Sequence, residues 1–315
     1  MNVIQPSLAP VEDPTAVASS TVAHAPTVIL ALETSTEYCS VALLIVPAEL
    51  VCLPSLRPAV EGLPPDLPAG VRVFCRHEHT GAVSSTLLLP AVQALFKQAG
   101  LALSACSAIA FGAGPGSFTG LRTATGVAQG LAFALQIPVV AVGTLMACAE
   151  AAHAADPDAA CVLAALDARM DQVYWALFAA DAETALGWRV LQSESLDAPQ
   201  AVEAQVASRL SSMPQAFTLA GNAAAAFGPR LSVAAQARTL AELALPHALP
   251  VALLGWRAWR AGLALPAEQA APLYVRDKVA QTTAEREAAK AQRLLDAAPV
   301  TPVTPVMPSL QAAPT

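Results

Sequence analysis

The sequence predicts an α/β protein with two lobes, and three observations lead to this prediction. The chain has 315 residues, which is enough for two domains of ordinary size. Its residues are 55% hydrophobic and 13% charged, which excludes a mainly disordered chain. Short β-rich runs alternate with helical patterns, and this alternation starts again after Asp156-Pro157-Asp158. We therefore expect a first lobe over residues 27–155 and a second lobe over residues 156–280.

Three other segments lack the periodicity of helices or strands. Residues 1–26 are rich in Ala, Pro, Ser, Thr and Val, a composition typical of a disordered tail. Residues 281–315 are expected to be helical at first and then, from residue 298, Pro-rich and disordered. Residues 47–70 contain six prolines and are predicted to be a loop inserted at the tip of a hairpin.

The first lobe begins with three predicted strands, of which the first two are joined by the polar turn Glu33-Thr34-Ser35-Thr36-Glu37. A helix follows, and then two strand–helix pairs. The predicted strands are Thr27–Leu32, Ser40–Val46, Val71–Cys75, Ser107–Gly112 and Pro138–Val142, and the predicted helices are Ser84–Ala99, Phe118–Leu135 and Thr144–Ala154. This βββαβαβα order is that of the actin, hexokinase and sugar-kinase architecture, although the order alone also permits other α/β folds.

Two of these helices have distinctive faces. The helix over Ser84–Ala99 carries an apolar stripe, ends before a glycine, and contains Pro90, which should kink it or mark its first turn. In the helix over Phe118–Leu135, small residues recur every four positions, at Gly126, Gly130 and Ala134. A face of small residues lets another backbone come close, either in the lobe's own core or from a partner helix.

The second lobe also opens with a predicted hairpin. Its two strands are joined by the turn Asp167-Ala168-Arg169-Met170-Asp171-Gln172. The predicted elements are the strands Cys161–Leu166, Val173–Ala179, Gly187–Glu194 and Phe217–Ala220, the segment Pro199–Leu210, and helices near 250–265. The segment Pro272-Leu273-Tyr274-Val275-Arg276-Asp277 is interpreted as a terminal strap packed on this lobe.

Charge, hydropathy and cysteine usage argue against several classes of protein. A net charge of −7 and a pI near 5.2 argue against strong binding of RNA or DNA by the chain itself. No apolar run is long enough for a membrane span, and no basic residue precedes Arg57, so we expect neither a membrane protein nor a secretory signal. The six cysteines form no C-x-x-C pair, and Cys39, Cys75, Cys106 and Cys161 are predicted to be reduced, buried thiols. A cytoplasmic protein fits these observations.

The glycine segment, Gly112–Arg122, is the most unusual part of the chain. It reads Gly-Ala-Gly-Pro-Gly-Ser-Phe-Thr-Gly-Leu-Arg and joins a predicted strand to a predicted helix. A helix N-terminus can bind an anion, but the segment has neither the Gly-Lys-Ser/Thr of a Walker A loop nor the last glycine of G-x-G-x-x-G. From spacing alone, tight packing of the helix on the sheet is favoured over phosphate binding.

Three other polar segments can each be interpreted either as part of a functional site or as an ordinary structural feature. Thr34–Thr36 could bind a phosphate, but Ser and Thr are also common turn residues. His77-Glu78-His79 lacks a third metal ligand nearby in the sequence, so a solvated strand end is favoured, and His247 lies between prolines. Asp167 and Arg169 could form a catalytic pair or a turn whose charges meet each other.

Taken together, four segments resemble the TsaB (YeaZ) family. They are Leu32-Glu33-Thr34-Ser35-Thr36 with the following Ser40-Val41-Ala42-Leu43, the run Gly114-Pro115-Gly116-Ser117-Phe118-Thr119-Gly120-Leu121-Arg122, Asp167-Ala168-Arg169, and Tyr274-Val275-Arg276. The second of these is by far the most specific, and the resemblance runs from about residue 28 to about residue 280. The resemblance implies a two-lobed, actin-like ASKHA (ribonuclease H-like) fold with mixed sheets flanked by helices.

The resemblance also implies a function. Members of the family are dimerisation and activating subunits for a catalytic paralogue, TsaD, in the complex that forms N6-threonylcarbamoyladenosine at position 37 of tRNAs reading ANN codons. It implies TsaE, an ATPase, as a further partner, tRNA contact only through the complex, ATP or ADP at the complex interface and a homodimer when the partner is absent. In the paralogue an H-x-x-x-H pair binds a metal, whereas the corresponding Gly143–Cys148 has no histidine. We therefore expect no catalytic residue, no metal ligand and no cofactor of its own.

The first-lobe helices form the partner interface in the family. Mapped onto this sequence, the interface residues are Ser84, Leu87, Leu88, Val92, Leu95, Thr119, Thr123, Gly126, Val127 and Gly130. The residues expected to contact any nucleotide or other anion are Thr34, Ser35, Gly114, Gly116 and Ser117.

Three alternatives remain at this point. An active ATPase or small-molecule kinase of the same fold would need a second phosphate loop, and Gly221-Asn222-Ala223 lacks the Gly-Gly pair of such loops. A metallopeptidase would need the missing histidine pair. A scaffold with no nucleotide site differs from the main interpretation only in whether Thr34–Thr36 ever touches ATP.

Overall fold

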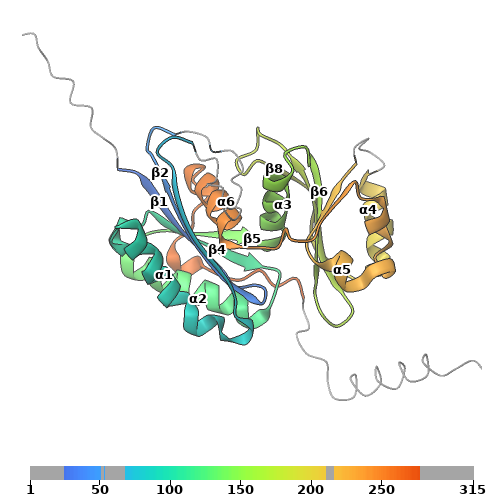
Figure 1. The fold of residues 1–315 in the computed structure, drawn as a ribbon, viewed down its shortest axis with the longest axis horizontal. Helices are drawn as coiled ribbons and strands as arrows, with labels where there is room; N and C mark the ends of the chain where they lie inside the picture. Colours follow the sequence, from blue (N-terminus) through green and yellow to red (C-terminus); the bar gives the residue numbers. More distant parts are fainter. Residues whose placement is uncertain (1–24, 51–52, 54–67, 211–215, 277–315) are drawn as a thin grey trace, which may run out of the picture. The chain divides into compact units, whose positions relative to one another are not determined.

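The computed structural model describes residues 25–50, 53, 68–210 and 216–276. Nearly all of the predicted tails, and residues 51–52 and 54–67 of the predicted insert over residues 47–70, lie outside these residues. The described part contains two five-stranded mixed sheets flanked by helices (Figure 1). The predicted α/β fold with two lobes is therefore confirmed, as is the βββαβαβα order of the first lobe.

The first sheet has the strand order β3-β2-β1-β4-β5. β1 (Thr27–Glu33), β2 (Tyr38–Val46) and β3 (Arg72–His79) are antiparallel neighbours, whereas β4 (Ala108–Gly114) pairs with β1, and β5 (Val139–Gly143) with β4, in parallel. β1, β2 and β4 are buried on both faces, which explains why their sequences are continuous apolar runs rather than alternating ones.

Helices cover both faces of this sheet. α1 (Ser84–Ala99) and α2 (Phe118–Leu135) pack on one face, and α6 (Ala248–Arg260) packs on the other (Figure 1). Successive residues of β1 point to opposite faces, so Leu30 belongs to the cluster with α1 and α2 and Ile29 to the cluster with α6. Pro90 lies inside α1, beyond its first turn.

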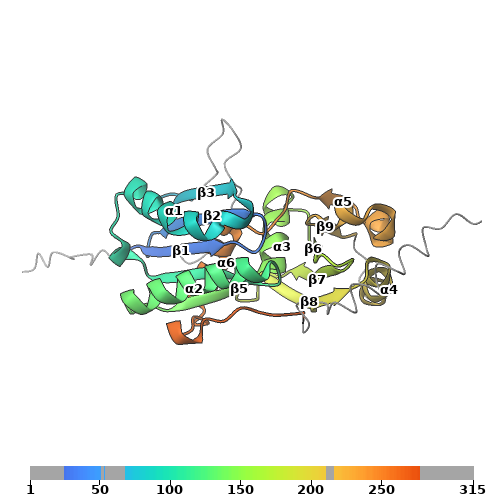
Figure 2. The ribbon, with the colours of Figure 1, turned by 90° about the horizontal axis from the view of Figure 1, so that it is seen from below.

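The second sheet has the strand order β10-β9-β6-β7-β8. α3 covers one face, while α4 and α5 cover the other (Figure 2). The sequence does not predict α5 or β10, because five and three residues are too few to show a period. The bounds are β6 (Cys161–Asp167), β7 (Val173–Ala180), β8 (Trp188–Asp197), β9 (Thr218–Ala220), β10 (Thr239–Ala241), α3 (Thr144–Ala155), α4 (Pro199–Leu210) and α5 (Ala223–Phe227).

α6 packs on the first sheet, although its place in the sequence assigned it to the second lobe. It contacts β1, β2 and β4, and its first backbone N–H donates to the hydroxyl of Ser40 in β2 at 2.9 Å. A Cβ on Gly255 would lie 2.4 Å from the Cβ of Ala110, so glycine allows the helix to approach β4 closely. The predicted lobe boundary is therefore wrong for residues 248–260, because α6 covers the face of the first sheet that α1 and α2 leave open.

Residues 263–275, which include the described start of the predicted strap, also pack on the first lobe, whereas the sequence placed the strap on the second. We call residues 263–275 the C-terminal strap. Leu265 exchanges two backbone hydrogen bonds of 2.8 Å with Val139, and the N–H of Leu273 donates to the carbonyl of Ala113 at 2.7 Å. Figure 2 shows the strap following β5 along the edge of the sheet. The unpaired backbone groups of β5 explain this position, since an edge strand offers them to any extended segment.

A buried ion pair joins α6 to α3 and β8. The guanidinium of Arg257 donates to both carboxylate oxygens of Glu150, at 2.9 and 3.2 Å, and the indole N–H of Trp188 donates to the same carboxylate at 2.7 Å. Both charged side chains are largely buried. Removing one partner of such a pair leaves an uncompensated buried charge, so this contact links the elements of the two lobes.

Candidate functional site

The glycine segment joins β4 to α2 and packs on the turn between β1 and β2. The Gly114–Pro115 peptide bond is cis, and Ser117 caps α2 by accepting a 3.4 Å hydrogen bond from the N–H of Gly120. The N–H of Ser117 donates to the carbonyl of Ser35 at 2.7 Å. The expected strand-to-helix turn is therefore present, and it is tied to the first hairpin.

Three glycines of the segment have no room for a side chain. A Cβ would lie 1.7 Å from Glu33 Oε2 if placed on Gly112, 2.6 Å from Ser35 Cβ if placed on Gly116, and 1.8 Å from the Thr34 carbonyl oxygen if placed on Gly120. The neighbours that occupy these spaces are Glu33, Thr34 and Ser35 of the first hairpin. Close packing of this chain on itself thus explains these three positions.

Gly114 is required for a different contact. Its φ of +126° lies in a region that favours glycine, and a Cβ there would be 2.5 Å from the carbonyl oxygen of Leu273 in the C-terminal strap. The strap therefore covers this part of the glycine segment. Of the five residues expected to contact an anion, Thr34 and Ser35 are buried, Gly114 lies under the strap, and Gly116 and Ser117 keep contact with solvent.

Glu33 lies at the centre of this packing, with an exposed fraction of 1%. Its Oε1 accepts a 2.5 Å hydrogen bond from the N–H of Ser35, while Oε2 has no partner in the described part of the chain. Burial raises the pKa of the Glu33 carboxyl, against the hydrogen bonds from Thr34 and Ser35, which lower it. The sequence marks Glu33 only as a polar residue at a strand end and does not predict its burial.

The N-terminus of α3 packs against the glycine segment and Glu33. The hydroxyl of Thr144, the first residue of α3, donates to the carbonyl of Pro115 at 2.5 Å, and the buried Cys148 lies near Glu33, whose charge raises the pKa of that thiol in addition to the larger effect of burial. This is the stretch in which the catalytic paralogue is expected to carry its histidines. Within the described residues, no group of three or more His, Cys, Asp or Glu side chains could hold a metal ion.

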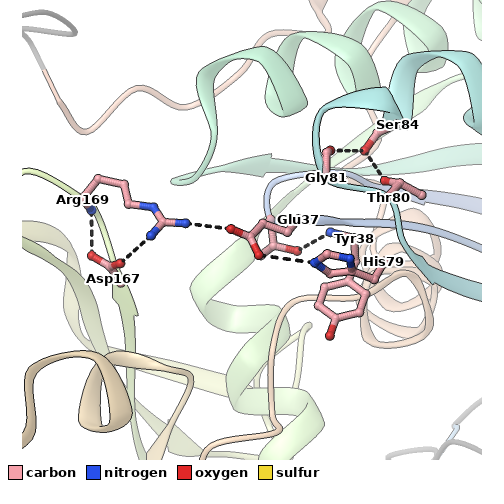
Figure 3. Close-up of polar contacts among 9 residues, drawn as sticks. Glu37, Tyr38, His79, Thr80, Gly81, Ser84, Asp167 and Arg169 are labelled. Atoms are coloured by element: carbon pink, nitrogen blue, oxygen red, sulfur yellow. Dashed lines mark hydrogen bonds and ion pairs between the residues drawn. The ribbon is translucent and has the colours of Figure 1, made fainter.

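A second polar group lies where the two sheets face each other (Figure 3). Arg169 pairs with Asp167 at 3.3 Å within its own turn, and with Glu37 of the first hairpin at 2.8 Å. The backbone at Arg169, Met170 and Asp171 is left-handed, with φ of 60, 53 and 63°. The geometry matches a turn whose charges meet each other, and it adds a contact between the lobes that the sequence does not predict.

The histidines of β3 belong to an aromatic cluster. The ring of His77 stacks on Tyr38 with centroids 4.4 Å apart, and His79 meets Tyr38 edge to face and pairs with Glu37 at 3.4 Å (Figure 3). His247 belongs to the same cluster, since its ring centroid lies 5.7 Å from that of His77. Burial, and secondarily His77, lower the pKa of His247 to about 4. β3 continues to His79, beyond the predicted Cys75, because its pairing with β2 continues to Tyr38.

One cysteine prediction is wrong. Cys39, Cys106 and Cys161 are buried as expected, but Cys75 is exposed on β3. β3 is one of the two edge strands of the first sheet, and most of its side chains reach solvent.

The predicted partner-interface residues separate into two groups. Ser84, Leu88, Val92 and Leu95 of α1 are buried, and the three apolar ones pack in the core cluster of this chain's own sheet, so these four do not lie on the exposed side of the helix. The apolar stripe of α1 faces inward because it covers the Leu30 side of β1. The remaining predicted residues keep some exposure, and they are Leu87, Thr119, Thr123, Gly126, Val127 and Gly130.

The outer side of α1 and α2 carries several exposed apolar side chains. Val83, Leu89 and Phe133 are 52%, 44% and 65% exposed, and the sequence did not single them out. A Cβ on Gly126 or Gly130 would meet nothing within 4 Å. We call this the helix-pair surface, and its residues are Val83, Leu87, Leu89, Thr119, Thr123, Gly126, Val127, Gly130 and Phe133.

Gly221-Asn222-Ala223 has a structural role in the second lobe. The side-chain carbonyl of Asn222 accepts a 2.9 Å hydrogen bond from the N–H of Asp167, and Gly221 packs against the carbonyl of Ala165. The segment thus joins β9 to the end of β6. No described helix is both long and apolar enough to cross a membrane.

Comparison with known proteins is consistent with this geometry. A family model described as "TsaD: tRNA N6-adenosine threonylcarbamoyltransferase" matches residues 78–284. The tRNA threonylcarbamoyladenosine biosynthesis protein TsaB of Escherichia coli is 33% identical over 66% of this chain and 84% of its own length. TsaB of Haemophilus influenzae is 32% identical over 80% of this chain and 94% of its own length.

Two solved structures from Pseudomonas aeruginosa are also similar. The structure of YeaZ has a TM-score of 0.60 at 36% identity and covers 79% of this chain and 99% of its own. A second structure, of an uncharacterized protein with similarity to peptidase YEAZ, has a TM-score of 0.62 at 37% identity and covers 79% and 100%. Its fold, its glycine segment and these relatives show that the chain belongs to the TsaB (YeaZ) family, within the wider group that the TsaD family model describes.

Proposed function

We propose that this chain is the non-catalytic subunit that binds and activates a TsaD-like catalytic subunit. The complex forms N6-threonylcarbamoyladenosine at position 37 of tRNAs that read ANN codons. The relatives named tRNA threonylcarbamoyladenosine biosynthesis protein TsaB support the pathway, and the match to the TsaD model supports a partner of the same fold.

The helix-pair surface is the observation that carries this proposal. Exposed apolar side chains such as Leu89 and Phe133 are unfavourable in water unless a partner covers them. Exposed glycines in the middle of a helix lower its stability. At Gly126 and Gly130 no close packing within the described residues requires a glycine, because an added Cβ would meet nothing within 4 Å. Both features suit a helix of another subunit that packs closely across α2.

Further partners follow from the same proposal. A chain with a net charge of −7 gains little from phosphate neutralisation, so tRNA binds through the catalytic subunit. A TsaE-like ATPase is a further partner. ATP or ADP binds at the complex interface rather than in this chain, because Thr34 and Ser35, two of the residues expected to contact it, are buried in this chain by itself. Two copies of the chain pair through the helix-pair surface when the catalytic subunit is absent.

Reconstitution of the modification tests the proposal. The reaction contains the TsaD-like subunit, the TsaE-like ATPase, the threonylcarbamoyl adenylate and tRNA, and modified adenosine is measured by mass spectrometry with and without this chain. We expect product only when the chain is present, and none from the chain alone. Full activity without it would contradict the proposal, and ATP turnover by the isolated chain would favour the kinase or ATPase alternative.

A matched pair of variants locates the binding surface. Leu87→Glu places a charge on the helix-pair surface, whereas Leu243→Glu makes the same change at a leucine of the second lobe that is 95% exposed. We expect Leu87→Glu to weaken binding of the catalytic subunit on the order of tenfold or more, and Leu243→Glu to leave it unchanged. Equal dissociation constants for the two variants in titration calorimetry would show that another surface binds the partner.

A further inference from the structure

Arg122 lies beside the helix-pair surface and is held in one orientation by two aromatic side chains. Its guanidinium carbon lies 3.9 Å from the centre of the Phe118 ring, and its Nε donates to the hydroxyl of Tyr274 at 3.1 Å. The rings of Phe118 and Tyr274 are themselves in contact, with centroids 5.4 Å apart. A guanidinium that is stacked and hydrogen-bonded in advance loses less side-chain entropy when it binds a ligand.

The C-terminal strap supplies the second of these aromatic contacts. The backbone of Leu273 is bonded to Ala113 and packs over Gly114, so the neighbouring Tyr274 is positioned above the first turn of α2. This arrangement gives a role to Tyr274 and to Arg122, the arginine at the end of the glycine segment, neither of which the packing of the hairpin requires.

Among the described residues, the outer edge of the Arg122 guanidinium has no hydrogen-bond or ion-pair partner. Tyr274 takes the Nε–H, and neither terminal nitrogen makes a hydrogen bond or an ion pair with the described residues. By contrast, Arg230 and Arg238 each pair with an aspartate of this chain, at 2.6 and 2.8 Å. The two terminal nitrogens of a guanidinium form a planar fork that matches the two oxygens of a carboxylate.

The charges of the surrounding sequence also favour an acidic group as the ligand of Arg122. The chain has 24 acidic residues, yet none lies between Glu78 and Glu150, a stretch that includes the whole of α1 and α2. Lys97 and Arg122 are the charged residues of these two helices, and both are cationic. The helix pair thus carries no negative charge, and an oriented positive group lies at the start of α2.

We propose that Arg122 is the charged anchor of the helix-pair surface and receives a carboxylate side chain of the catalytic subunit, with Tyr274 as its positioning residue. This inference rests on the proposed function, in which that subunit docks here. A carboxylate is favoured over the phosphates of tRNA, because one cation on an acidic chain cannot hold a polyanion, whereas a desolvated ion pair at the rim of an apolar interface gives orientation and specificity.

Affinity measurements on the full chain with its catalytic subunit test the proposal. We expect Arg122→Glu to weaken binding by about 100-fold and Arg122→Lys by about tenfold, because lysine keeps the charge and loses the fork. Lys97→Glu, the same charge change on α1, serves as the control and should change the affinity less than about threefold. Tyr274→Phe should weaken binding by about threefold with an unchanged thermal unfolding midpoint, since it removes one hydrogen bond.

The outcomes separate this proposal from the proposed function. If Arg122→Glu and Arg122→Lys bind as well as the parent chain while Leu87→Glu does not, the anchor is overturned and the docking surface is retained. If none of these variants changes binding, both are overturned. Reduced retention of tRNA by the complex, with unchanged affinity between the subunits, would assign Arg122 to phosphate and also overturn the carboxylate. A charge swap provides a further test, in which Arg122→Glu is combined with a variant of the catalytic subunit that has an arginine in place of an acidic residue. Restored affinity would support the anchor and identify its partner.

Discussion

Glycines in and near α2 occupy two opposite environments. Gly112, Gly116 and Gly120 lie against the first hairpin, where an added Cβ would come within 2.6 Å of another atom. Gly126 and Gly130 lie further along the same helix, where an added Cβ would meet nothing within 4 Å. The same residue type therefore serves the fold of this chain in the first group, while in the second group an added side chain would enter open space among the described residues.

This difference separates glycines that the fold requires from glycines that are open to a binding partner. A glycine that packs against its own chain stabilises the native state, because any side chain would displace the hairpin. An exposed glycine in a helix destabilises it by about 1 kcal/mol relative to alanine. Substitution by alanine should therefore have opposite effects on the two groups, and binding should be affected only by the second.

The largest effect is expected from Gly120→Ala. A methyl group there would lie 1.8 Å from the carbonyl oxygen of Thr34, so the first hairpin or α2 must move. We expect the free energy of unfolding to fall by about 3 kcal/mol in urea denaturation, despite the better helix propensity of alanine. An unchanged urea midpoint would mean that the hairpin yields without cost and that the contrast between the two groups does not hold.

A smaller and pH-dependent effect is expected beneath the same segment, at Glu33. Because burial raises its pKa above the reference value of 4.5, the folded chain keeps this proton at pH values where the unfolded chain releases it. Stability contributed by this group is therefore lost as pH rises from about 4.5 toward the folded-state pKa. Glu33→Gln, which stays neutral, should gain stability relative to the parent chain over that range.

Urea midpoints of both proteins at pH 4.5 and at neutral pH measure this difference, with Glu49→Gln, at an exposed glutamate, as the control. The expected result is a gap between Glu33→Gln and the parent chain that widens with pH. A gap of the same size at both pH values would show that Glu33 is ionised in the folded state.

The smallest effect on stability is expected from Gly126→Ala. Its methyl group would enter open space, so only helix propensity changes, and the free energy of unfolding should rise by about 1 kcal/mol. If a partner helix packs there, the same variant should bind the catalytic subunit more weakly, and Gly126→Gln more weakly still. Unchanged affinity for both variants would leave these glycines without a role at the interface.

Most of the secondary structure could be predicted from the sequence. The continuous apolar runs of β1, β2 and β4 and the apolar stripe of α1 each lie within one segment, so their period is visible without the rest of the chain. Elements of three to five residues, such as β10 and α5, are too short for this kind of evidence.

The candidate site was predicted less completely. An apolar stripe shows that one side of a helix is covered, but it does not show whether its own sheet or a partner covers it. The sequence therefore cannot indicate that Leu88, Val92 and Leu95 face this chain's own sheet. Leu89 and Phe133 have no distinguishing sequence pattern and were missed. The contact between His77 and His247 joins residues 170 positions apart, which no local pattern can indicate.

By itself, the sequence determined the two-lobed α/β class, the strands and longer helices, and the glycine segment on which the family assignment depends, because these follow from local periodicity and from residue types. Only the tertiary structure decided that α6 and the C-terminal strap cover the first lobe, that Glu33, Thr34 and Ser35 fill the space beside three glycines, and that Gly126 and Gly130 are open. These facts depend on which surfaces meet across long separations in the chain, and that is settled by burial of apolar area and by unpaired backbone groups at sheet edges.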